Sequence, residues 1–130
     1  DLFLLYEKLL KDINQNENLE LTLRRFELDM LDTMGYGFDY EYDINNNEPI
    51  DINSSYRFVS ERGFRKSKNA TFLGKDIINL KNRNLKDVPL KELKEITKKA
   101  ITYCLDGNDL ASRKIFRAMK KWFSELVQIL

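Results

Sequence analysis

The chain has 130 residues, of which 42% are apolar and 33% are charged, and these values are typical of one globular domain. It has no histidine and a single cysteine, Cys104, which excludes an internal disulfide, histidine- or cysteine-based metal chemistry and a serine–histidine or cysteine–histidine nucleophile. A carboxylate site for magnesium or calcium stays open, although no loop has the matching pattern. The sequence has neither a membrane-spanning apolar run nor a secretory signal pattern, so we expect a cytoplasmic protein.

The net charge of +1 conceals two oppositely charged halves. Residues 1–53 carry 4 basic and 13 acidic side chains, whereas residues 54–130 carry 18 basic and 8 acidic side chains. A basic half suggests an anionic partner. The alternative is that the two halves attract each other and that the remaining charge is solvated.

Two helices are expected at the start of the chain. Residues 2–13 are apolar around most of the helix circumference, which favours a fragment whose upstream segment covers the extra face; a fully buried first helix is the alternative. The second helix spans about residues 19–34. Its apolar residues recur every three or four positions and share one face: Leu23, Phe26, Met30, Leu31 and Met34. The short polar link between the helices predicts antiparallel packing.

Gly35 follows the last periodic residue, and a glycine there ends a helix at little steric cost. Residues 38–42 then alternate aromatic and acidic side chains, which predicts a short strand with the aromatic residues buried and the acidic residues exposed. A second strand at residues 56–60 and a return strand beginning at Phe64 predict a hairpin that turns at Gly63. Residues 44–50 between them are a loop by composition.

Three helical segments follow the hairpin. A short helix is expected around residues 77–80, and a longer helix begins at Pro89. The apolar stripe of the longer helix consists of Leu90, Leu93, Ile96 or Thr97, Ala100, Ile101 and Leu105. Asp109 is placed to cap a last helix that runs to Leu130. We therefore expect a mostly helical α+β fold: a helical bundle with a small β-hairpin insertion, divided into a helical pair (1–35), the insertion (36–68) and basic helices (70–130).

The adjacent pair Arg24 and Arg25 is the first candidate binding site. An arginine at the edge of an apolar groove binds carboxylate or phosphate bidentately, and such a groove suits a short acidic peptide ending in an aromatic residue. The alternative is that each arginine pairs along its own helix with an acidic neighbour: Glu17, Glu20, Glu27 or Asp29.

The basic C-terminal helices are the second candidate. Basic residues in rows at helical spacing can follow nucleic-acid phosphates without reading sequence: Lys94, Lys98, Arg113, Lys114, Arg117, Lys120 and Lys121. A solvated helix face is the alternative.

The aromatic residues around the hairpin either stack on bases or form the core, and the core is the more usual role: Tyr36, Phe38, Tyr40, Tyr42, Tyr56, Phe58 and Phe64. The acidic residues of the same region are interpreted as surface, not as a metal or acid–base site: Asp39, Glu41, Asp43, Glu48 and Asp51.

Several ordered motifs resemble one known family. The hexapeptide from Leu23 to Leu28 (LRRFEL), followed by Leu31 and Gly35-Tyr36-Gly37, resembles the signature of the helical C-terminal region of the bacterial RecO family. Further matching stretches follow in the same order: residues 48–51, 56–58, 61–64, 71–74 and 107–117. The resemblance therefore covers nearly the whole chain.

This resemblance implies an accessory factor of DNA repair and recombination, not an enzyme. RecO proteins anneal complementary strands and, with RecR, load RecA onto single strands coated by the single-stranded DNA-binding protein SSB. They also carry an N-terminal OB-fold that binds DNA, and nothing in this sequence resembles it. Many members have a four-cysteine zinc site in the hairpin region; this chain has no cysteine there and so resembles the zinc-free branch.

The SSB tail is acidic and ends in Pro-Phe with a free carboxylate, and the helical region of RecO receives it. By motif position Arg24 is the expected contact of that carboxylate. The surrounding candidates are Arg25, Phe26, Leu28, Leu31, Met34 and Tyr36, some of which must be core. The implied partners are the SSB tail, RecR and single- and double-stranded DNA, in the nucleoid-associated cytoplasm of a bacterium, with no membrane. The alternatives are a non-specific DNA-phosphate-binding domain and a purely structural helical domain that docks a partner.

Overall fold

The computed structural model describes residues 2–15, 18–60 and 62–106, together with Lys114, Arg117 and Lys121. The described elements, in chain order, are α1 (Leu2–Gln15), α2 (Leu19–Thr33), β1 (Asp39–Asp43), β2 (Ser55–Val59), β3 (Gly63–Lys66), β4 (Phe72–Leu73), α3 (Gly74–Lys81), the 3-10 turn η1 (Leu85–Asp87) and α4 (Leu90–Asp106). None of the described helices is long and apolar enough to cross a membrane.

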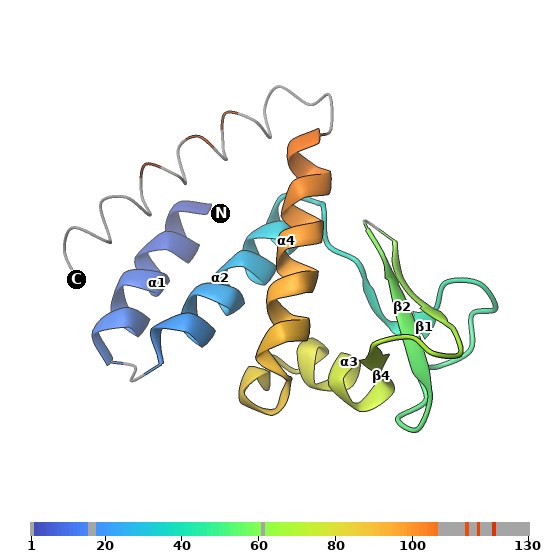
Figure 1. Cartoon of the computed structure of the whole chain (residues 1–130). Helices are drawn as coiled ribbons and strands as arrows, with labels where there is room; N and C mark the ends of the chain where they lie inside the picture. Colours follow the sequence, from blue (N-terminus) through green and yellow to red (C-terminus); the bar gives the residue numbers. More distant parts are fainter. Residues whose placement is uncertain are drawn as a thin grey trace.

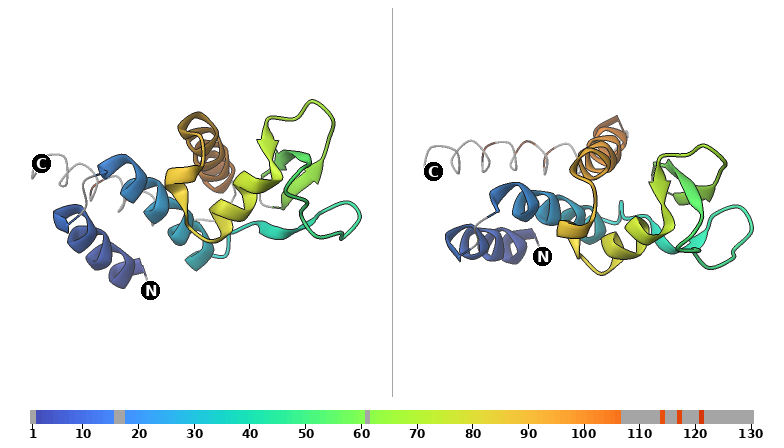
Figure 2. Two further views of the ribbon diagram at one scale, coloured as in Figure 1. Left: turned by 90° about the horizontal axis from the view of Figure 1, so that it is seen from below. Right: turned by 60° about the horizontal axis from the view of Figure 1, so that its bottom comes forward.

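The molecule is elongated, with a pair of helices at one end and a small sheet at the other. Figure 1 shows α1 and α2 side by side and antiparallel, as the short link predicts, with α4 crossing α2. In both views of Figure 2 the sheet lies at the end remote from α1, and α3 lies between the sheet and the helices. This α+β arrangement confirms the expected fold class.

The start and end of α2 follow from local chemistry. The Asn18 side chain accepts a hydrogen bond from the backbone N–H of Leu21 at 3.2 Å and so caps the helix N-terminus. At the other end Gly35 has a φ of +82°, a left-handed conformation that glycine adopts without strain, and the chain leaves the helix there. Both signals are visible in the sequence.

The sheet is larger than the predicted hairpin. β2 and β3 form that hairpin, with Phe58 opposite Phe64, and Gly63 has a φ of +138° at the turn. However, β1 joins the other edge of β3 in parallel and β4 pairs with β2, so the strand order is β1-β3-β2-β4. The two-residue β4 lies outside the predicted insertion, and its length leaves no room for an alternating pattern.

The expected alternation in β1 is wrong at its second half. Phe38 and Tyr40 point inward, but Tyr42 is exposed and Asp43 is buried. The cause is an irregularity in the β1–β3 register between Asp39 and Asp43, which reverses the facing of the residues beyond it. The buried Asp43 carboxylate accepts backbone hydrogen bonds from Asn45 at 2.8 Å and Lys66 at 3.2 Å, so it serves the turn and not a surface site.

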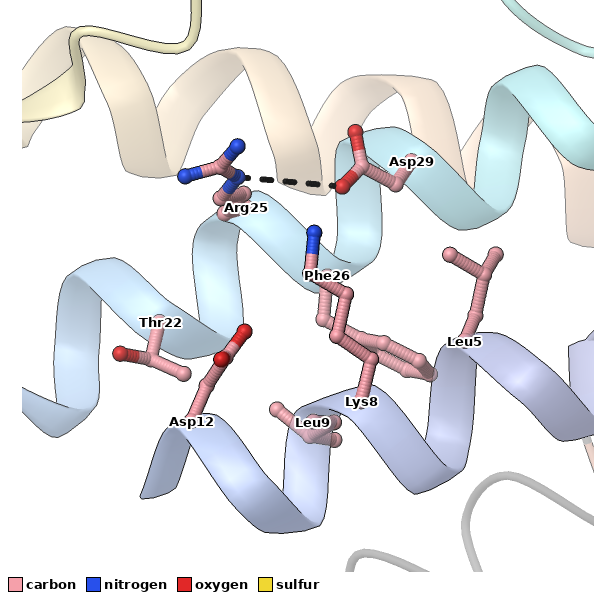
Figure 3. Close-up of a pocket in the computed structure, with 8 residues that line it drawn as sticks. All are labelled: Leu5, Lys8, Leu9, Asp12, Thr22, Arg25, Phe26 and Asp29. Carbon is pink, nitrogen blue, oxygen red and sulfur yellow. Dashed lines mark ion pairs between the residues drawn. The ribbon is translucent and has the colours of Figure 1, made fainter. Parts of the chain in front are cut away.

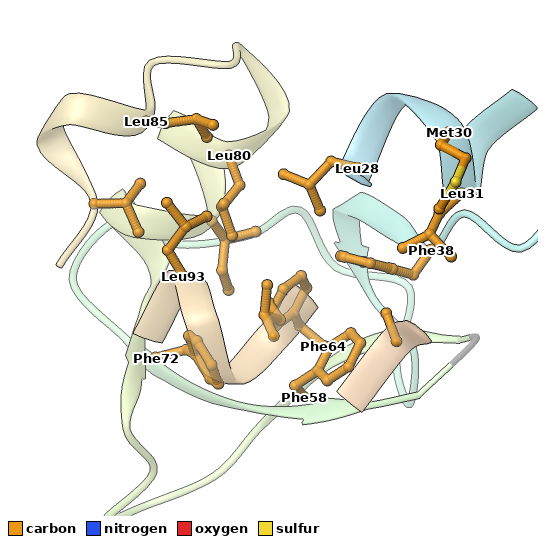
Figure 4. Packing of buried hydrophobic residues seen from close by; sticks show 14 of the residues in the cluster. Leu28, Met30, Leu31, Phe38, Phe58, Phe64, Phe72, Leu80, Leu85 and Leu93 are labelled. Carbon is orange, nitrogen blue, oxygen red and sulfur yellow. The ribbon is translucent and has the colours of Figure 1, made fainter. Parts of the chain in front are cut away.

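One hydrophobic core joins the sheet to the helices. Phe64 is fully buried at its centre, with ring centroids of Phe58 at 5.5 Å, Phe38 at 5.8 Å and Phe72 at 6.0 Å. Figure 4 shows how leucines from α2, α3, η1 and α4 close over these rings. The aromatic cluster of the hairpin region is thus largely core.

The predicted apolar stripe of α4 differs from the observed one at two positions: Leu90 is exposed and Cys104 is buried. The predicted last helix lies mostly outside the described residues.

Arg83, just after α3, binds the helical end to the sheet end. Its side chain is only 13% exposed; Nε donates to Asp29 Oδ1 at 2.9 Å and Nη2 to Asp32 Oδ2 at 2.7 Å, both on α2. Nη1 donates to the Leu80 carbonyl at 2.9 Å and to the Tyr40 hydroxyl of β1 at 3.3 Å. Burial raises the pKa of Tyr40 to about 12, so this hydroxyl stays neutral at physiological pH.

We expect Arg83→Ala to lower the free energy of unfolding by roughly 2–4 kcal/mol, since it leaves two carboxylates and a buried hydroxyl without their partner. Arginine and alanine both carry a Cβ, so the strain of the positive φ of +56° is the same in both. The loss of stability therefore measures the contacts of the Arg83 side chain. Arg83→Lys should restore little of the lost stability, because the ammonium group of a lysine lacks the planar, forked set of donors that a guanidinium presents. Urea denaturation measures both variants.

The matched control is Lys81→Ala, which removes a 2.9 Å ion pair between Lys81 and Glu41, both about half exposed. Such a pair contributes at most about 1 kcal/mol. Equal losses in the Lys81 and Arg83 variants would contradict the role assigned to Arg83.

Candidate functional site: a cationic cleft and a basic groove

The two adjacent arginines of α2 point in different directions. Arg24 is 22% exposed and pairs with Glu27 at 3.2 Å and Glu20 at 3.6 Å on its own helix. Arg25 is 49% exposed, and its ion pair with Asp29 is 4.0 Å long. Consecutive helix residues are about 100° apart, so one arginine lies beside α4 while the other lies beside α1.

Arg25 borders a cleft of about 290 Å³, which we call the α1–η1 cleft. It is lined by residues of three segments that are distant in sequence: Lys8, Asp12, Asn18, Leu21, Thr22, Arg25, Arg83, Asn84, Leu85 and Lys86. A narrow extension of about 20 Å³ continues between α1 and α2, and Figure 3 shows Phe26 and Leu9 in it beneath Lys8 and Arg25. The cleft therefore has an apolar interior beneath charged side chains.

Three cations of the α1–η1 cleft are available to a ligand. In the described part of the chain no ion pair engages Lys8 or Lys86, and that of Arg25 is long. Arg83 also reaches the cleft but is occupied by Asp29 and Asp32. Asp12 is the one acidic side chain among the described residues that line the cleft, so positive charge predominates among them. Such a site suits an anionic group attached to an apolar one.

The structure separates the residues that the sequence grouped around Arg24. Arg25 and Phe26 line the α1–η1 cleft or its extension. Leu28 and Leu31 are buried in the core, so they are among the pocket candidates that had to be core, and Met34 and Tyr36 are partly buried against it. The reason is that α2 packs against α1 on one side and against α4 and η1 on others, so it has more than one apolar face. Sequence reasoning missed Lys8, Leu21, Leu85 and Lys86, because no local signal links them.

The basic candidates of the C-terminal half also separate. Lys94 lies 3.7 Å from Glu20 of α2. Lys98 lines a groove of about 720 Å³ between α4 and β2, together with Phe58, Ser60, Glu95, Lys99, Thr102 and Tyr103; we call it the α4–β2 groove. Lys114, Arg117 and Lys121 are exposed, while Arg113 and Lys120 lie outside the described residues. Among the residues described, no cluster of three or more carboxylate or thiol groups could hold a metal ion.

Glu27 is a buried acidic residue between α2 and α4. Burial raises its pKa from 4.5 to about 7, against the opposing effect of the neighbouring Arg24 guanidinium. Its Oε2 and the Nε of Arg24 are both buried without a hydrogen-bond partner. Arg24 is therefore part of the α2–α4 interface, where its charge partly compensates a costly buried carboxylate.

We expect Glu27 to make the protein less stable as the pH rises from about 4.5 to about 7. Over this interval the unfolded state has already lost the proton that the folded state still holds, so deprotonation favours unfolding. Glu27→Gln should remove this decline and should be the more stable form at pH 8 by up to roughly 3.5 kcal/mol, at about 1.4 kcal/mol per pKa unit. Thermal unfolding at several pH values measures it, with the exposed Glu41→Gln as control. An unchanged pH profile in Glu27→Gln would contradict this assignment.

The fold and these surfaces define a small binding domain with a helical pair, a mixed sheet and cationic surfaces. Residues 1–114 match the family model described as "Recombination protein O C terminal", so the chain belongs to the RecO C-terminal family. It is 39% identical over 115 residues to the DNA repair protein RecO of Vibrio parahaemolyticus, covering 85% of this chain and 47% of that protein. The DNA repair protein RecO of Haemophilus influenzae is 34% identical over 119 residues, which cover 88% of this chain and 50% of that protein. The chain thus spans about half the length of the curated relatives it matches.

Proposed function

We propose that this chain is the partner-binding part of a bacterial recombination mediator and that it binds the acidic C-terminal tail of SSB in the α1–η1 cleft. The observation that carries the proposal is that three cations without short ion pairs, from three separate segments, surround an apolar interior. The terminal phenylalanine packs against Leu21 and Leu85 of the cleft, its carboxylate meets Arg25, and the acidic residues before it meet Lys8 and Lys86. Annealing of DNA and loading of RecA with RecR are the activities that this binding would serve.

Arg25 is a better candidate than Arg24 for the tail carboxylate. Arg24 is committed to Glu20 and Glu27 in a largely buried interface, and a ligand would have to break these pairs and expose the carboxylate of Glu27. Arg25 would give up only its 4.0 Å contact with Asp29, which retains Arg83 at 2.9 Å. The energetic cost of binding is therefore smaller at Arg25.

A second function, binding of DNA phosphates, is supported by the exposed cations of the C-terminal half. Lys94, Lys98, Lys114, Arg117 and Lys121 are all exposed. Such cations give affinity that falls steeply with salt and carries no sequence information.

The test of tail capture is fluorescence anisotropy with a labelled peptide of the SSB tail sequence. We expect Arg25→Ala to weaken binding by at least about tenfold, since a charged hydrogen-bonding partner of a carboxylate contributes roughly 1.5–3 kcal/mol. Removing the final phenylalanine from the peptide should have a comparable effect. Lys11→Ala is the matched control, because Lys11 is exposed on α1 and does not line the cleft.

Arg24→Ala separates the two arginines. We expect it to lower stability through Glu27 while leaving tail affinity within about threefold of the unmodified chain, when both are measured at a temperature where each is folded. Loss of tail binding in Arg24→Ala but not in Arg25→Ala would place the carboxylate at the other arginine. Equal binding in Arg25→Ala and the Lys11 control would refute the cleft as the receptor.

A further inference from the structure

The α4–β2 groove has features that tail capture does not use. It lies between α4 and β2, and both Phe58 and Tyr103 line it. A smaller hollow of about 290 Å³ shares Phe58 and Lys99 with it and continues to Arg57 and Thr71. The two hollows form one path along the surface, and neither shares a lining residue with the α1–η1 cleft.

The charges along this path favour an anionic ligand. Lys99 is paired with Glu95 at 3.0 Å, so those two charges cancel. Among the residues described, Lys98 and Arg57 have no ion pair, and both are exposed. The net charge offered to a ligand is therefore positive at both ends of the path.

The sheet register adds a second, independent indication. Arg57 of β2 lies directly opposite Arg65 of β3 in the antiparallel ladder. Like charges at directly opposite positions destabilise a strand pair, and no described acidic residue forms an ion pair with either arginine. A phosphate beside Arg57, which lines the smaller hollow, would lessen this repulsion, whereas Arg65 lines neither hollow.

Aromatic surface accompanies the cations. The Tyr103 side chain is 43% exposed and stands one helical turn beyond Lys98 and Lys99. A basic groove with an exposed aromatic ring is the arrangement by which proteins bind unpaired nucleic acid, since every base has a flat face that stacks on such a ring. A duplex, whose bases are already stacked, would not use the ring.

We propose that the α4–β2 groove binds a strand of unpaired nucleic acid, with Lys98 and Arg57 contacting phosphates and Tyr103 stacking on a base. This inference rests on the proposed mediator role, in which DNA is a ligand, and it assigns that ligand to a surface separate from the tail receptor.

The test is anisotropy of a labelled oligothymidylate of about ten nucleotides, titrated with the chain at several salt concentrations. We expect Tyr103→Ala to weaken binding at least about fivefold and Tyr103→Phe to leave it nearly unchanged, because phenylalanine keeps the stacking face. Lys98→Ala should reduce the slope of log affinity against log salt by about 0.7, the value for one phosphate contact on a single strand. Lys91→Ala is the matched control, since Lys91 is exposed on α4 outside the groove.

Each outcome decides between distinct possibilities. The groove proposal would be overturned by equal effects of Lys91→Ala and Lys98→Ala. It would also be overturned by equal binding of Tyr103→Ala and Tyr103→Phe when far-ultraviolet circular dichroism shows both folded. A duplex that binds as tightly as the single strand would overturn it as well. Displacement of the oligonucleotide by the SSB-tail peptide would also overturn it, because the two ligands would then share a site. Oligonucleotide binding that survives in Arg25→Ala while peptide binding is lost would support both surfaces. Peptide binding without oligonucleotide binding would overturn the groove alone.

Discussion

The arrangement of this domain depends on the guanidinium of Arg83. It bonds two carboxylates of α2, the hydroxyl of Tyr40 on β1 and the carbonyl of Leu80 on α3, and its carbon lies 5.4 Å from the centroid of the Tyr40 ring. These contacts hold the residue in a left-handed backbone conformation that costs an L-residue roughly 1–2 kcal/mol. The turn that they fix leads directly into Leu85 and Lys86, so the same side chain that joins helices to sheet also forms one wall of the α1–η1 cleft.

The charge asymmetry of the sequence is partly explained by contacts of this kind. Arg83 with Asp29 and Asp32, Lys81 with Glu41, and Lys94 with Glu20 all pair a cation of the basic half with an acidic residue of the first half. The two halves therefore do attract each other. The charges that remain after this pairing are the informative ones. Among the described residues, some of these charges line two hollows, the cleft beside Arg25 and the groove beside Lys98.

Local patterns were sufficient for the elements and insufficient for their assembly. The spacing in α2, the stop at Gly35 and the β2–β3 hairpin each depend on residues a few positions apart, and each was predicted. The Asn18 cap is equally local but was not predicted. The parallel pairing of β1 with β3, the burial of Asp43 and the role of Arg83 depend on contacts made 20 or more residues away. The two arginines of the candidate site illustrate the same point: Arg24 and Arg25 are adjacent and of one type, and their different exposure, 22% and 49%, depends on where α1 and α4 lie.

The two proposed surfaces lie on different sides of the α2–α4 contact and share no side chain. Two ligands bound there would have independent affinities unless that contact has two arrangements that each ligand favours differently. The contact contains the buried Glu27 carboxylate, Arg24 and Thr97, and two of its polar atoms lack a partner. An imperfectly satisfied polar interface is less strongly held than the aromatic core beside it. If binding at the cleft and the groove is coupled, the coupling would arise at this contact, because α2 contributes residues to the cleft and α4 contributes residues to the groove.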